Sequence, residues 1–543
     1  MIMKWWQEAV VYQIYPRSFM DSNNDGIGDL QGIINKLDYI QDLGANVIWL
    51  SPVYESPNDD NGYDISDYYS IMGEFGTMQD MERLIKEAGK RDIKIVMDLV
   101  ANHTTTSHKW FKQALDDKKS KYHDYYYFYE NTGKTPNDLQ SVFLGSAWEE
   151  TPDRDEMYLH MFAKSQADLN WHNPQVRKEL YQMINWWLEK GIGGFRLDVI
   201  DYVAKEIEDK IITDGPKLHD YIREMTEKTF SHYDVMTVGE TWSADTEKAI
   251  KYSNLDGSEL SMIFNFSHIL LDMDGEEKWD YKEVSLNELK TDFEERQQGL
   301  YNKGWDALFW NNHDLPRIVS RWGDDKQWRV ESAKMFGTLL HFMQGTPYVY
   351  QGEELGMTNV DFQEIEKFKD IEILNMYHER INRGYSHDEI MNSIHHIGRD
   401  NARTPMQWNS TEYGGFSKVA PWININSNYK MINAEAQIAD DNSVYSYYKK
   451  IIEFRRTSQY KSIIRDGNFE LIDKHNEDIF AYKRILGSYE LIVICNFRPF
   501  KVQYRCNDLL DLEYKNLLLS NYDRMLEEEY LKPYEAKVIF GKK

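Results

Sequence analysis

The chain has 543 residues, of which 41% are hydrophobic and 14% aromatic, and 90 acidic against 63 basic side chains give it a formal net charge of −27. This length exceeds one ordinary core and predicts a catalytic domain of TIM-barrel size with one or two smaller units. The acidic surface argues against nucleic acid and anionic membranes as partners. No segment reaches the roughly 20 apolar residues that a membrane-spanning helix needs.

Cysteine usage and the N-terminal segment indicate the compartment. Cys495 and Cys506 are the two cysteines of the chain, which predicts reduced thiols and not a disulfide framework. The N-terminal apolar run is interrupted by Gln7, Glu8 and Gln13, so it lacks the core of a signal peptide. We therefore expect a cytoplasmic protein, and we expect it to be a monomer.

Short apolar runs recur along the chain at intervals that leave room for helices. The eight runs are Val10–Tyr15, Asn46–Ser51, Lys94–Val100, Gly194–Ile200, Val235–Glu240, Met262–Phe266, Ala307–Trp310 and Pro347–Tyr350. Helical periodicity lies between them, for example at Met78–Arg91 and Gln175–Lys190. This alternation predicts an α/β fold, a (β/α)8 TIM barrel whose parallel strands are these runs.

Two departures from the alternation predict additional domains. The third and fourth runs lie about 90 residues apart, far more than one helix and its loops require, so we expect an inserted domain at residues 102–173. Beyond a last barrel helix that ends at Arg456, short alternating stretches predict a C-terminal antiparallel β domain, a β-sandwich, at residues 461–543. The barrel then comprises residues 1–101 and 174–460.

Ionisable residues stand at the ends of several runs, where a TIM barrel places its active site. Hydrolysis of a glycosidic bond needs one carboxylic acid and one carboxylate on opposite sides of the bond. Asp198 and Glu240 follow successive strands, which can hold their carboxyl groups about 5 to 5.5 Å apart, as in retaining enzymes. Arg196 shares the side-chain parity of Asp198 and can favour its ionised form. Glu240 is expected in a less polar setting, as a general acid requires.

Four strand-end segments resemble the conserved regions of the α-amylase superfamily, glycoside hydrolase family thirteen. They are Asp98-Leu-Val-Ala-Asn-His103, Gly194-Phe-Arg-Leu-Asp-Val199, Val238-Gly-Glu-Thr-Trp242 and Asn311-Asn-His-Asp314. The resemblance covers nearly the whole chain and implies Asp198 as nucleophile, Glu240 as acid/base and Asp314 as a third carboxylate that grips sugar hydroxyls. It also implies a set of substrate-binding residues: His103, Phe162, Gln166, Arg196 and His313.

A loop after the second run resembles the oligo-1,6-glucosidase and glucan 1,6-α-glucosidase branch of that family. In Asn58-Asp-Asp-Asn-Gly-Tyr-Asp64, the resemblance implies Tyr63 as a stacking platform and Asp64 as the holder of the terminal sugar. Arg399 is the expected partner of Asp64, and such a charged pair would favour removal of terminal glucose.

Two further positions bear on this branch. Gln166-Ala-Asp-Leu-Asn170 resembles its Gln-Pro-Asp-Leu-Asn motif, with Ala167 in place of proline. Val199 directly follows the expected nucleophile, and in similar enzymes valine there accompanies α-1,6 activity, whereas alanine or threonine accompanies α-1,4 activity. The resemblance therefore favours the α-1,6 linkage.

The segment Asp21-Ser-Asn-Asn-Asp-Gly-Ile-Gly-Asp29 carries oxygen-bearing side chains at alternate positions. Its spacing resembles the first part of an EF-hand loop, although Gly32 stands where the closing glutamate would be. The family resemblance implies a structural Ca²⁺ with these ligands: Asp21, Asn23, Asp25, the Ile27 carbonyl and Asp29. An Asx-rich turn without an ion is the alternative. We expect no organic cofactor.

The leading prediction is a retaining, exo-acting hydrolase that releases terminal glucose from small α-1,6-linked isomalto-oligosaccharides through a glucosyl-Asp198 intermediate. Competitors on the same fold are an α-1,4-glucosidase and a trehalose-6-phosphate hydrolase, for which Lys278 is a candidate phosphate ligand. A sucrose isomerase is disfavoured because Ser320–Asp325 lacks the Arg-Leu-Asp-Arg-Asp segment usual in that branch. A non-catalytic, transporter-associated relative generally loses catalytic carboxylates, and this chain keeps all three.

Overall fold

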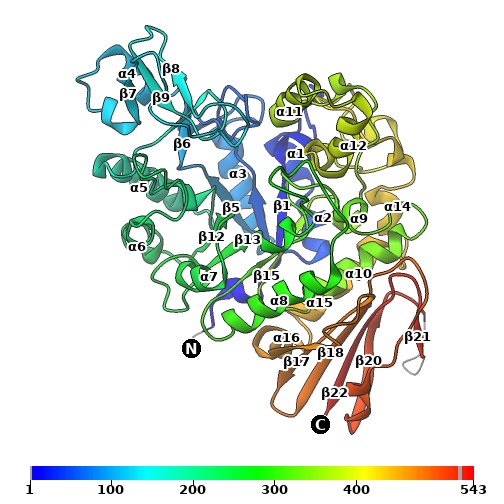
Figure 1. Ribbon diagram of the computed structural model, residues 1–543. Coiled ribbons are helices and arrows are strands. Elements are labelled where there is room, and N and C mark those ends of the chain that lie inside the picture. Colours follow the sequence, from blue (N-terminus) through cyan, green and yellow to red (C-terminus); the bar gives the residue numbers. More distant parts are fainter. Residues whose placement is uncertain (1–2, 524–528) are drawn as a thin grey trace.

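Eight parallel strands form the centre of the molecule (Figure 1). The structure is a computed structural model that describes residues 3–523 and 529–543. The strand order is β13-β12-β11-β5-β2-β1-β15-β14, and a parallel bridge between Ile263 and Asp306 joins the two outer strands. The predicted (β/α)8 barrel is therefore confirmed. Its strands are β1 (Val11–Ile14), β2 (Val47–Leu50), β5 (Lys94–Leu99), β11 (Gly194–Leu197), β12 (Met236–Thr241), β13 (Met262–Asn265), β14 (Ala307–Leu308) and β15 (Thr346–Tyr350).

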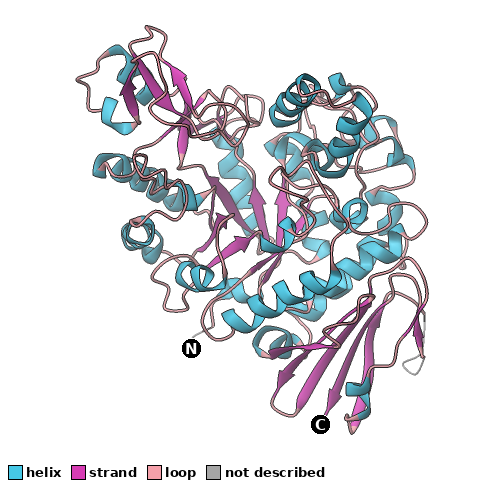
Figure 2. Ribbon diagram, viewed as in Figure 1, coloured by secondary structure: helices cyan, strands magenta, loops and turns pink. Residues whose placement is uncertain are grey.

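Helices surround the barrel strands, whereas α4 (Lys109–Asp116) lies in a segment that projects from the barrel (Figure 2). Those that begin before residue 330 are α1 (Leu30–Asn35), α2 (Leu37–Leu43), α3 (Met78–Gly89), α4 (Lys109–Asp116), α5 (Pro174–Glu189), α6 (Leu218–Lys228), α7 (Thr246–Tyr252), α8 (Leu286–Leu300), α9 (Ile318–Arg321) and α10 (Arg329–His341). Those that follow are α11 (Ile371–Asn382), α12 (His387–Ile397), α13 (Asp400–Arg403), α14 (Ala434–Ile438), α15 (Val444–Arg456) and α16 (Lys461–Asp466). None of the helices within residues 3–523 and 529–543 is long and apolar enough to cross a membrane.

Local sequence explains where the two predicted barrel helices begin. A capping box between Thr77 and Asp80 starts α3, whose buried residues include Leu84 on the face toward the core. The side chain of Asn173 caps α5, and Pro174 occupies its first turn, where a missing N–H costs nothing. Both helices match the predicted segments to within one or two residues.

The segment between β5 and α5 projects from one side of the barrel (Figure 1). It contains an antiparallel pair, β6 (His103–Thr105) with β10 (Gln166–Asp168), and a three-stranded sheet of β7 (Phe128–Glu130), β9 (Glu156–Leu159) and β8 (Trp148–Glu150). Trp148 and Leu159 belong to a separate apolar core in this segment. The boundaries at residues 102 and 173 remain predictions.

An antiparallel β domain ends the chain, as predicted. Its main sheet has the order β16 (Asn468–Ile472), β17 (Ile479–Leu486), β18 (Tyr489–Asn496), β22 (Ala536–Lys542) and β20 (Tyr514–Ser520), and β19 (Val502–Gln503) pairs with β21 (Tyr530–Leu531). One short helix, α16, follows the helix that was expected to be the last. Both cysteines, Cys495 and Cys506, are buried free thiols in this domain.

Candidate active site

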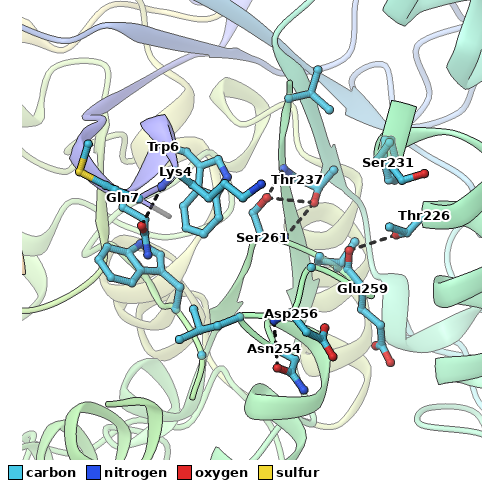
Figure 3. Close-up of a pocket in the computed structure, with 18 of the residues that line it drawn as sticks. Lys4, Trp6, Gln7, Thr226, Ser231, Thr237, Asn254, Asp256, Glu259 and Ser261 are labelled. Atoms are coloured by element: carbon cyan, nitrogen blue, oxygen red, sulfur yellow. Dashed lines mark hydrogen bonds between the residues drawn. The ribbon is translucent and has the colours of Figure 1, made fainter. Parts of the chain in front are cut away.

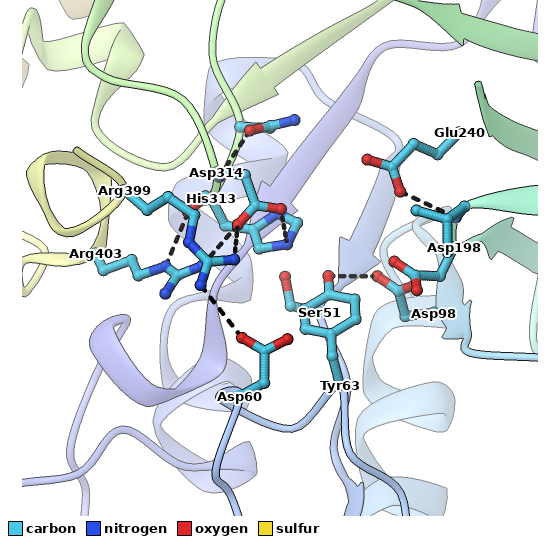
Figure 4. A network of polar contacts seen from close by, with 12 residues as sticks. Ser51, Asp60, Tyr63, Asp98, Asp198, Glu240, His313, Asp314, Arg399 and Arg403 are labelled. Atoms are coloured by element: carbon cyan, nitrogen blue, oxygen red, sulfur yellow. Dashed lines mark hydrogen bonds and ion pairs between the residues drawn. The ribbon is translucent and has the colours of Figure 1, made fainter. Parts of the chain in front are cut away.

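Three carboxyl side chains meet at the C-terminal ends of strands β5, β11 and β12. Arg196 Nη1 donates hydrogen bonds of 2.7 Å each to Asp98 Oδ1 and Asp198 Oδ1. Arg196 Nη2 donates to Glu240 Oε2 at 2.5 Å. All four side chains are buried, and Figure 4 shows Asp98, Asp198 and Glu240 side by side. We call Asp98, Arg196, Asp198 and Glu240 the β11 cluster.

In the β11 cluster, the one guanidinium group of Arg196 contacts three carboxyl groups. Positive charge is therefore in short supply, and this affects the pKa values of the carboxyl groups. Burial raises the pKa of Asp198 well above its usual range; the charge of Arg196 opposes the shift, and the charge of Glu240 adds to it. Burial likewise raises the pKa of Asp98, again against the charge of Arg196. Carboxylates that compete for one cation in a buried site bind protons more readily than isolated ones. Arg196 is therefore the cation in the cluster that favours the ionised form of Asp198.

The setting of Glu240 is polar, so the expectation of a less polar one is wrong. Besides Arg196, the backbone N–H of Val199 donates to Glu240 Oε2 at 3.1 Å, and the indole N–H of Trp242 donates to Oε1 at 3.2 Å. The reason is that β12 lies directly beside β11, which brings both the guanidinium and the turn after Asp198 within reach. Three donors thus fix the direction of the Glu240 carboxyl group.

A second group of charged residues faces the β11 cluster across the barrel opening (Figure 4). Asp314 Oδ1 lies 2.6 Å from Arg403 Nη2 and 3.3 Å from Arg399 Nη1, and Asp314 Oδ2 lies 3.1 Å from His313 Nε2. Arg399 also pairs with Asp370 at 2.5 Å. We call Asp60, Asp314, Asp370, Arg399 and Arg403 the α13 cluster, because the two arginines lie one turn apart at α13.

At Asp314 and Asp370 of the α13 cluster, the nearby cations outweigh the effect of burial on the pKa. Burial acts to raise the pKa of Asp314, but His313, Arg399 and Arg403 hold that pKa well below its usual range. At Asp370, burial also acts to raise the pKa, but the charges of Arg399 and Arg403 lower it. These carboxylates stay ionised at every pH at which the protein would work, so they are suited to accepting hydrogen bonds from sugar hydroxyls.

The predicted pair between Asp64 and Arg399 is wrong, because Asp60 occupies that place. Arg399 Nη2 lies 3.3 Å from Asp60 Oδ1. Asp64 instead accepts the backbone N–H groups of Asp59 and Asp60, at 2.9 Å and 3.2 Å, and so shapes the loop from inside. Left-handed backbone at Asn61 (φ 50°) helps to reverse the chain here, and this reversal turns Asp60 toward Arg399. Burial raises the pKa of Asp60 to about 7, while Arg399 opposes the shift.

The predicted aromatic platform joins the two clusters. The ring of Tyr63 stacks on His313, with ring centroids 5.1 Å apart and an interplanar angle of 7°. The Tyr63 hydroxyl donates to Asp98 Oδ2 at 3.0 Å. Gln13 Nε2 lies 2.9 Å from His313 Nδ1 and holds the imidazole from below. Tyr63 and His313 therefore lie between the β11 and α13 clusters, as Figure 4 shows.

The remaining predicted substrate-binding residues form a wall that β6 and β10 contribute. Gln166 Nε2 donates to Asp60 Oδ2 at 3.1 Å and to the Tyr63 carbonyl at 3.2 Å. His103 Nε2 lies 2.8 Å from the same carbonyl. Burial lowers the pKa of His103 to about 4, so the imidazole is neutral at pH 7. The ring of Phe162 lies beside His103, with centroids 5.4 Å apart.

Sequence reasoning overlooked several members of the two clusters. Asp98 was visible as a carboxylate inside a buried run, and Arg403 as an arginine four residues after Arg399. Asp60 lay inside the quoted loop but was passed over in favour of Asp64. Asp370 caps α11 far from any strand end, so no pattern in the sequence pointed to it.

The Asp21–Asp29 loop keeps its shape through its own hydrogen bonds. Asp21 Oδ1 accepts the backbone N–H groups of Asn23 and Asn24, and Asp25 Oδ1 accepts that of Ile27 at 2.8 Å. These are Asx-type contacts, as the alternative reading without an ion requires. In the part of the chain that the structure describes, no three His, Cys, Asp or Glu side chains are placed to hold a metal ion. The loop donors are nevertheless all oxygens, which is the chemistry that Ca²⁺ prefers.

A separate cavity of about 540 Å³ opens at the opposite end of the barrel (Figure 3). Its lining includes Trp6 ahead of β1, Ser261 ahead of β13 and Trp305 ahead of β14. These positions lie at the N-terminal ends of the strands. Because TIM barrels carry their chemistry at the C-terminal ends, the two clusters and not this cavity are the candidate active site.

Comparison with known proteins agrees with this geometry. Residues 13–467 match the family model described as alpha amylase, catalytic domain. The chain is 49% identical to the oligo-1,6-glucosidase of Halalkalibacterium halodurans over the full length of both proteins. It is also 49% identical to the glucan 1,6-alpha-glucosidase of Streptococcus pneumoniae, with 98% of each chain covered. A solved trehalose-6-phosphate hydrolase variant from Bacillus licheniformis superposes with a TM-score of 0.95 at 45% identity, and the match covers both chains fully.

Proposed function

Because this chain belongs to the alpha-amylase family of glycoside hydrolases, we propose that it releases terminal glucose from small α-1,6-linked isomalto-oligosaccharides with retention of configuration. The observation that carries the proposal is the β11 cluster. Asp198 and Glu240 extend from adjacent strands and share the Arg196 guanidinium, so nucleophile and acid/base lie within reach of one glycosidic bond.

In the first step, Asp198 attacks the anomeric carbon of the terminal glucose while Glu240 protonates the glycosidic oxygen. The bond between that carbon and oxygen breaks, the shortened sugar leaves, and a glucosyl ester forms on Asp198. In the second step, Glu240 takes a proton from water, and the water oxygen attacks the same carbon and frees Asp198. Two inversions at one carbon give net retention.

The α13 cluster supports exo action. Asp314 and Asp60, both held by Arg399, present carboxylate oxygens on one side of the reacting sugar. Such oxygens accept hydrogen bonds from the hydroxyls of a chain end and leave no space for another sugar beyond it. This arrangement also gives Asp60 the role that the sequence had suggested for Asp64.

Three observations favour a neutral α-1,6 substrate over the alternatives. Val199 is buried beside the nucleophile, and both curated relatives compared above carry the 1,6 linkage in their names. Lys278 Nζ, the candidate phosphate ligand, is paired with Glu372 at 2.6 Å, and Glu372 also pairs with Arg399 at 3.2 Å. A paired lysine next to a carboxylate offers little attraction to a phosphate, which disfavours trehalose 6-phosphate.

A substrate panel tests the proposal. Initial rates of glucose release are measured with isomaltose, maltose, sucrose and trehalose 6-phosphate, and kcat/KM is compared between them. Isomaltose is expected to exceed each of the others by at least about tenfold. A higher value for maltose would overturn the linkage, and a higher value for trehalose 6-phosphate would overturn the neutral substrate. Failure to release glucose from any of them would overturn glucoside hydrolysis itself.

We further propose that the protein acts as a cytoplasmic monomer whose Asp21–Asp29 loop binds a structural Ca²⁺. Two buried free thiols support a reducing compartment. The ion would be held by the five oxygen donors named for this loop: Asp21, Asn23, Asp25, the Ile27 carbonyl and Asp29. Asp21 Oδ2 accepts the hydroxyl of Ser417 at 2.6 Å, so a bound cation would strengthen the contact between this loop and the segment around Ser417.

A further inference from the structure

The turn after Asp198 and the loop after β12 hold each other through two carboxylates. The backbone N–H of Val199 donates to Glu240 Oε2 at 3.1 Å. In the opposite direction, Asp201 Oδ2 accepts the backbone N–H groups of Trp242 at 3.1 Å and Ser243 at 3.4 Å. Strand β12 therefore supplies a carboxylate to the backbone of the turn, and the turn supplies one to the backbone of the loop after β12.

The backbone of Val199 adopts a conformation that valine disfavours, so the surrounding contacts must hold it. Val199 has φ 35° and ψ 50°, in the left-handed region that a β-branched residue rarely adopts. Such a conformation persists only where surrounding contacts enforce it. The left-handed angles redirect the chain after Val199, and two residues later Asp201 contacts the loop that carries Trp242.

Burial of the Asp201 carboxyl group costs free energy that packing alone does not offset. Its side chain is fully buried, and Oδ1 has no hydrogen-bond partner. Its other oxygen, Oδ2, also accepts the Ser243 hydroxyl at 2.9 Å. The neighbouring Asp214 shares that hydroxyl at 2.6 Å and pairs with Lys248 at 2.8 Å, but the contacts of Asp214 do not include the backbone of Trp242.

We propose that Asp201 is a positioning residue for the acid/base: by fixing the backbone of Trp242, it places the indole N–H on Glu240 Oε1 and keeps that carboxyl group aimed at the glycosidic oxygen. The indole contact measures 3.2 Å. The inference rests on the proposed role of Glu240 in glycoside hydrolysis.

Substrates with different leaving groups separate this role from a general effect on folding. A sugar leaves as an alkoxide and needs a proton from Glu240, whereas 4-nitrophenolate is a stable anion and leaves without one. The value of kcat/KM reports the steps up to the first bond cleavage. A misplaced Glu240 therefore lowers kcat/KM for isomaltose and spares that for 4-nitrophenyl α-glucoside.

The experiment compares Asp201→Ala, Asp201→Asn and the wild-type chain on both substrates. Asp201→Ala is expected to lower kcat/KM for isomaltose about 10- to 100-fold, because small misplacements of a catalytic group cost that much. For 4-nitrophenyl α-glucoside the same variant should lose less than about threefold. Asp201→Asn should stay within about threefold of wild type on both, because its amide oxygen can accept the same backbone N–H groups.

Asp214→Asn is the matched control, since the Asp214 side chain reaches the Ser243 hydroxyl but not the backbone N–H groups that Asp201 holds. It is expected to leave the ratio of the two kcat/KM values at the wild-type level. Circular dichroism checks folding, and Asp201→Ser, whose hydroxyl is too short to reach Trp242, replaces Asp201→Ala if the alanine variant does not fold.

Three results would overturn the positioning role. They are equal losses on the two substrates in the folded Asp201→Ala or Asp201→Ser variant, a loss on isomaltose in Asp201→Asn as large as in Asp201→Ala, and a shifted ratio in Asp214→Asn. If the wild type cleaves maltose and not isomaltose, maltose replaces it, because its leaving group is also a sugar. A wild type that cleaves no α-glucoside refutes the proposed function and not the geometry of these contacts.

Discussion

The β11 and α13 clusters lie in one barrel opening but balance charge in opposite ways. In the β11 cluster, Arg196 alone faces three carboxylates, and burial raises the pKa of Asp198. In the α13 cluster, Arg399 and Arg403 both contact Asp314 and hold its pKa well below the usual range, against the effect of burial. A single guanidinium group opposes protonation of the nucleophile Asp198, whereas two guanidinium groups and His313 together keep Asp314 charged.

The largest expected effect comes from Asp198→Asn in the β11 cluster. Turnover of isomaltose should fall by about 10⁴-fold or more, because an amide cannot form the glucosyl ester. The melting temperature should stay the same or rise, since one of three competing carboxylates loses its charge. Glucose release and thermal melting are measured together, with Asp220→Asn on the surface as control. Unchanged turnover would remove Asp198 from the mechanism.

The next effect distinguishes the two aspartates of the Asn58–Asp64 loop. Asp60→Asn should lower kcat/KM for isomaltose about 10- to 100-fold, because it removes the carboxylate that Arg399 holds toward the sugar. Asp64→Asn should mainly lower the melting temperature, because Asp64 accepts backbone N–H groups and shapes the loop. A larger catalytic loss in Asp64→Asn than in Asp60→Asn would return the sugar-binding role to Asp64.

A smaller effect concerns pH and the buried histidines near and beyond the clusters. Burial lowers the pKa of His103 to about 4 and those of His108 and His341 to about 3. In the unfolded chain, histidine becomes protonated near pH 6.5, whereas these three side chains become protonated in the native state only at a lower pH. At these histidines the unfolded state therefore binds more protons, so they lower the free energy of unfolding as pH drops from about 6.5 toward 4. Buried Asp60, whose pKa is raised to about 7, acts in the opposite direction, so the histidine contribution is isolated by substitution.

Thermal melting at pH 7 and pH 5 measures this loss. Replacement of His103 by Gln should remove the part of the loss that His103 contributes, about 2 kcal/mol at pH 5. His232→Gln, on the surface, should leave the loss unchanged. An equal change in stability between pH 7 and pH 5 in His103→Gln and in the wild-type chain would contradict a neutral His103.

The smallest effect lies outside both clusters, in the Asp21–Asp29 loop. If the loop binds Ca²⁺, a chelator should lower the melting temperature by a few degrees, on the order of what ligand binding well above its Kd contributes. Asp25→Asn should reproduce the shift and abolish the response to the chelator. The kcat at 25 °C should not change, because the loop contacts neither cluster. An unaltered melting curve would count against the ion.

The barrel and most of the site could be predicted from the sequence, because strand ends obey a simple rule. Apolar runs located the strands, and parity along β11 placed Arg196 and Asp198 on one side. Parity has no meaning in the loop that holds Asp60 and Asp64, where the backbone includes the left-handed residue Asn61 and Asp60 is the carboxylate that meets Arg399. The polar setting of Glu240 depends on the neighbouring strand, and the role proposed for Asp201 depends on a backbone angle, so neither could be read from local sequence.

The anomer of glucose that appears first tests the account most directly. Isomaltose is mixed with the protein, and NMR follows the anomeric proton of the released glucose before mutarotation. Because Asp198 forms a covalent ester and Glu240 then activates water on the face that the leaving group vacated, α-glucose should appear first. Initial appearance of β-glucose would mean a single displacement and would contradict the assignment of Asp198 as nucleophile.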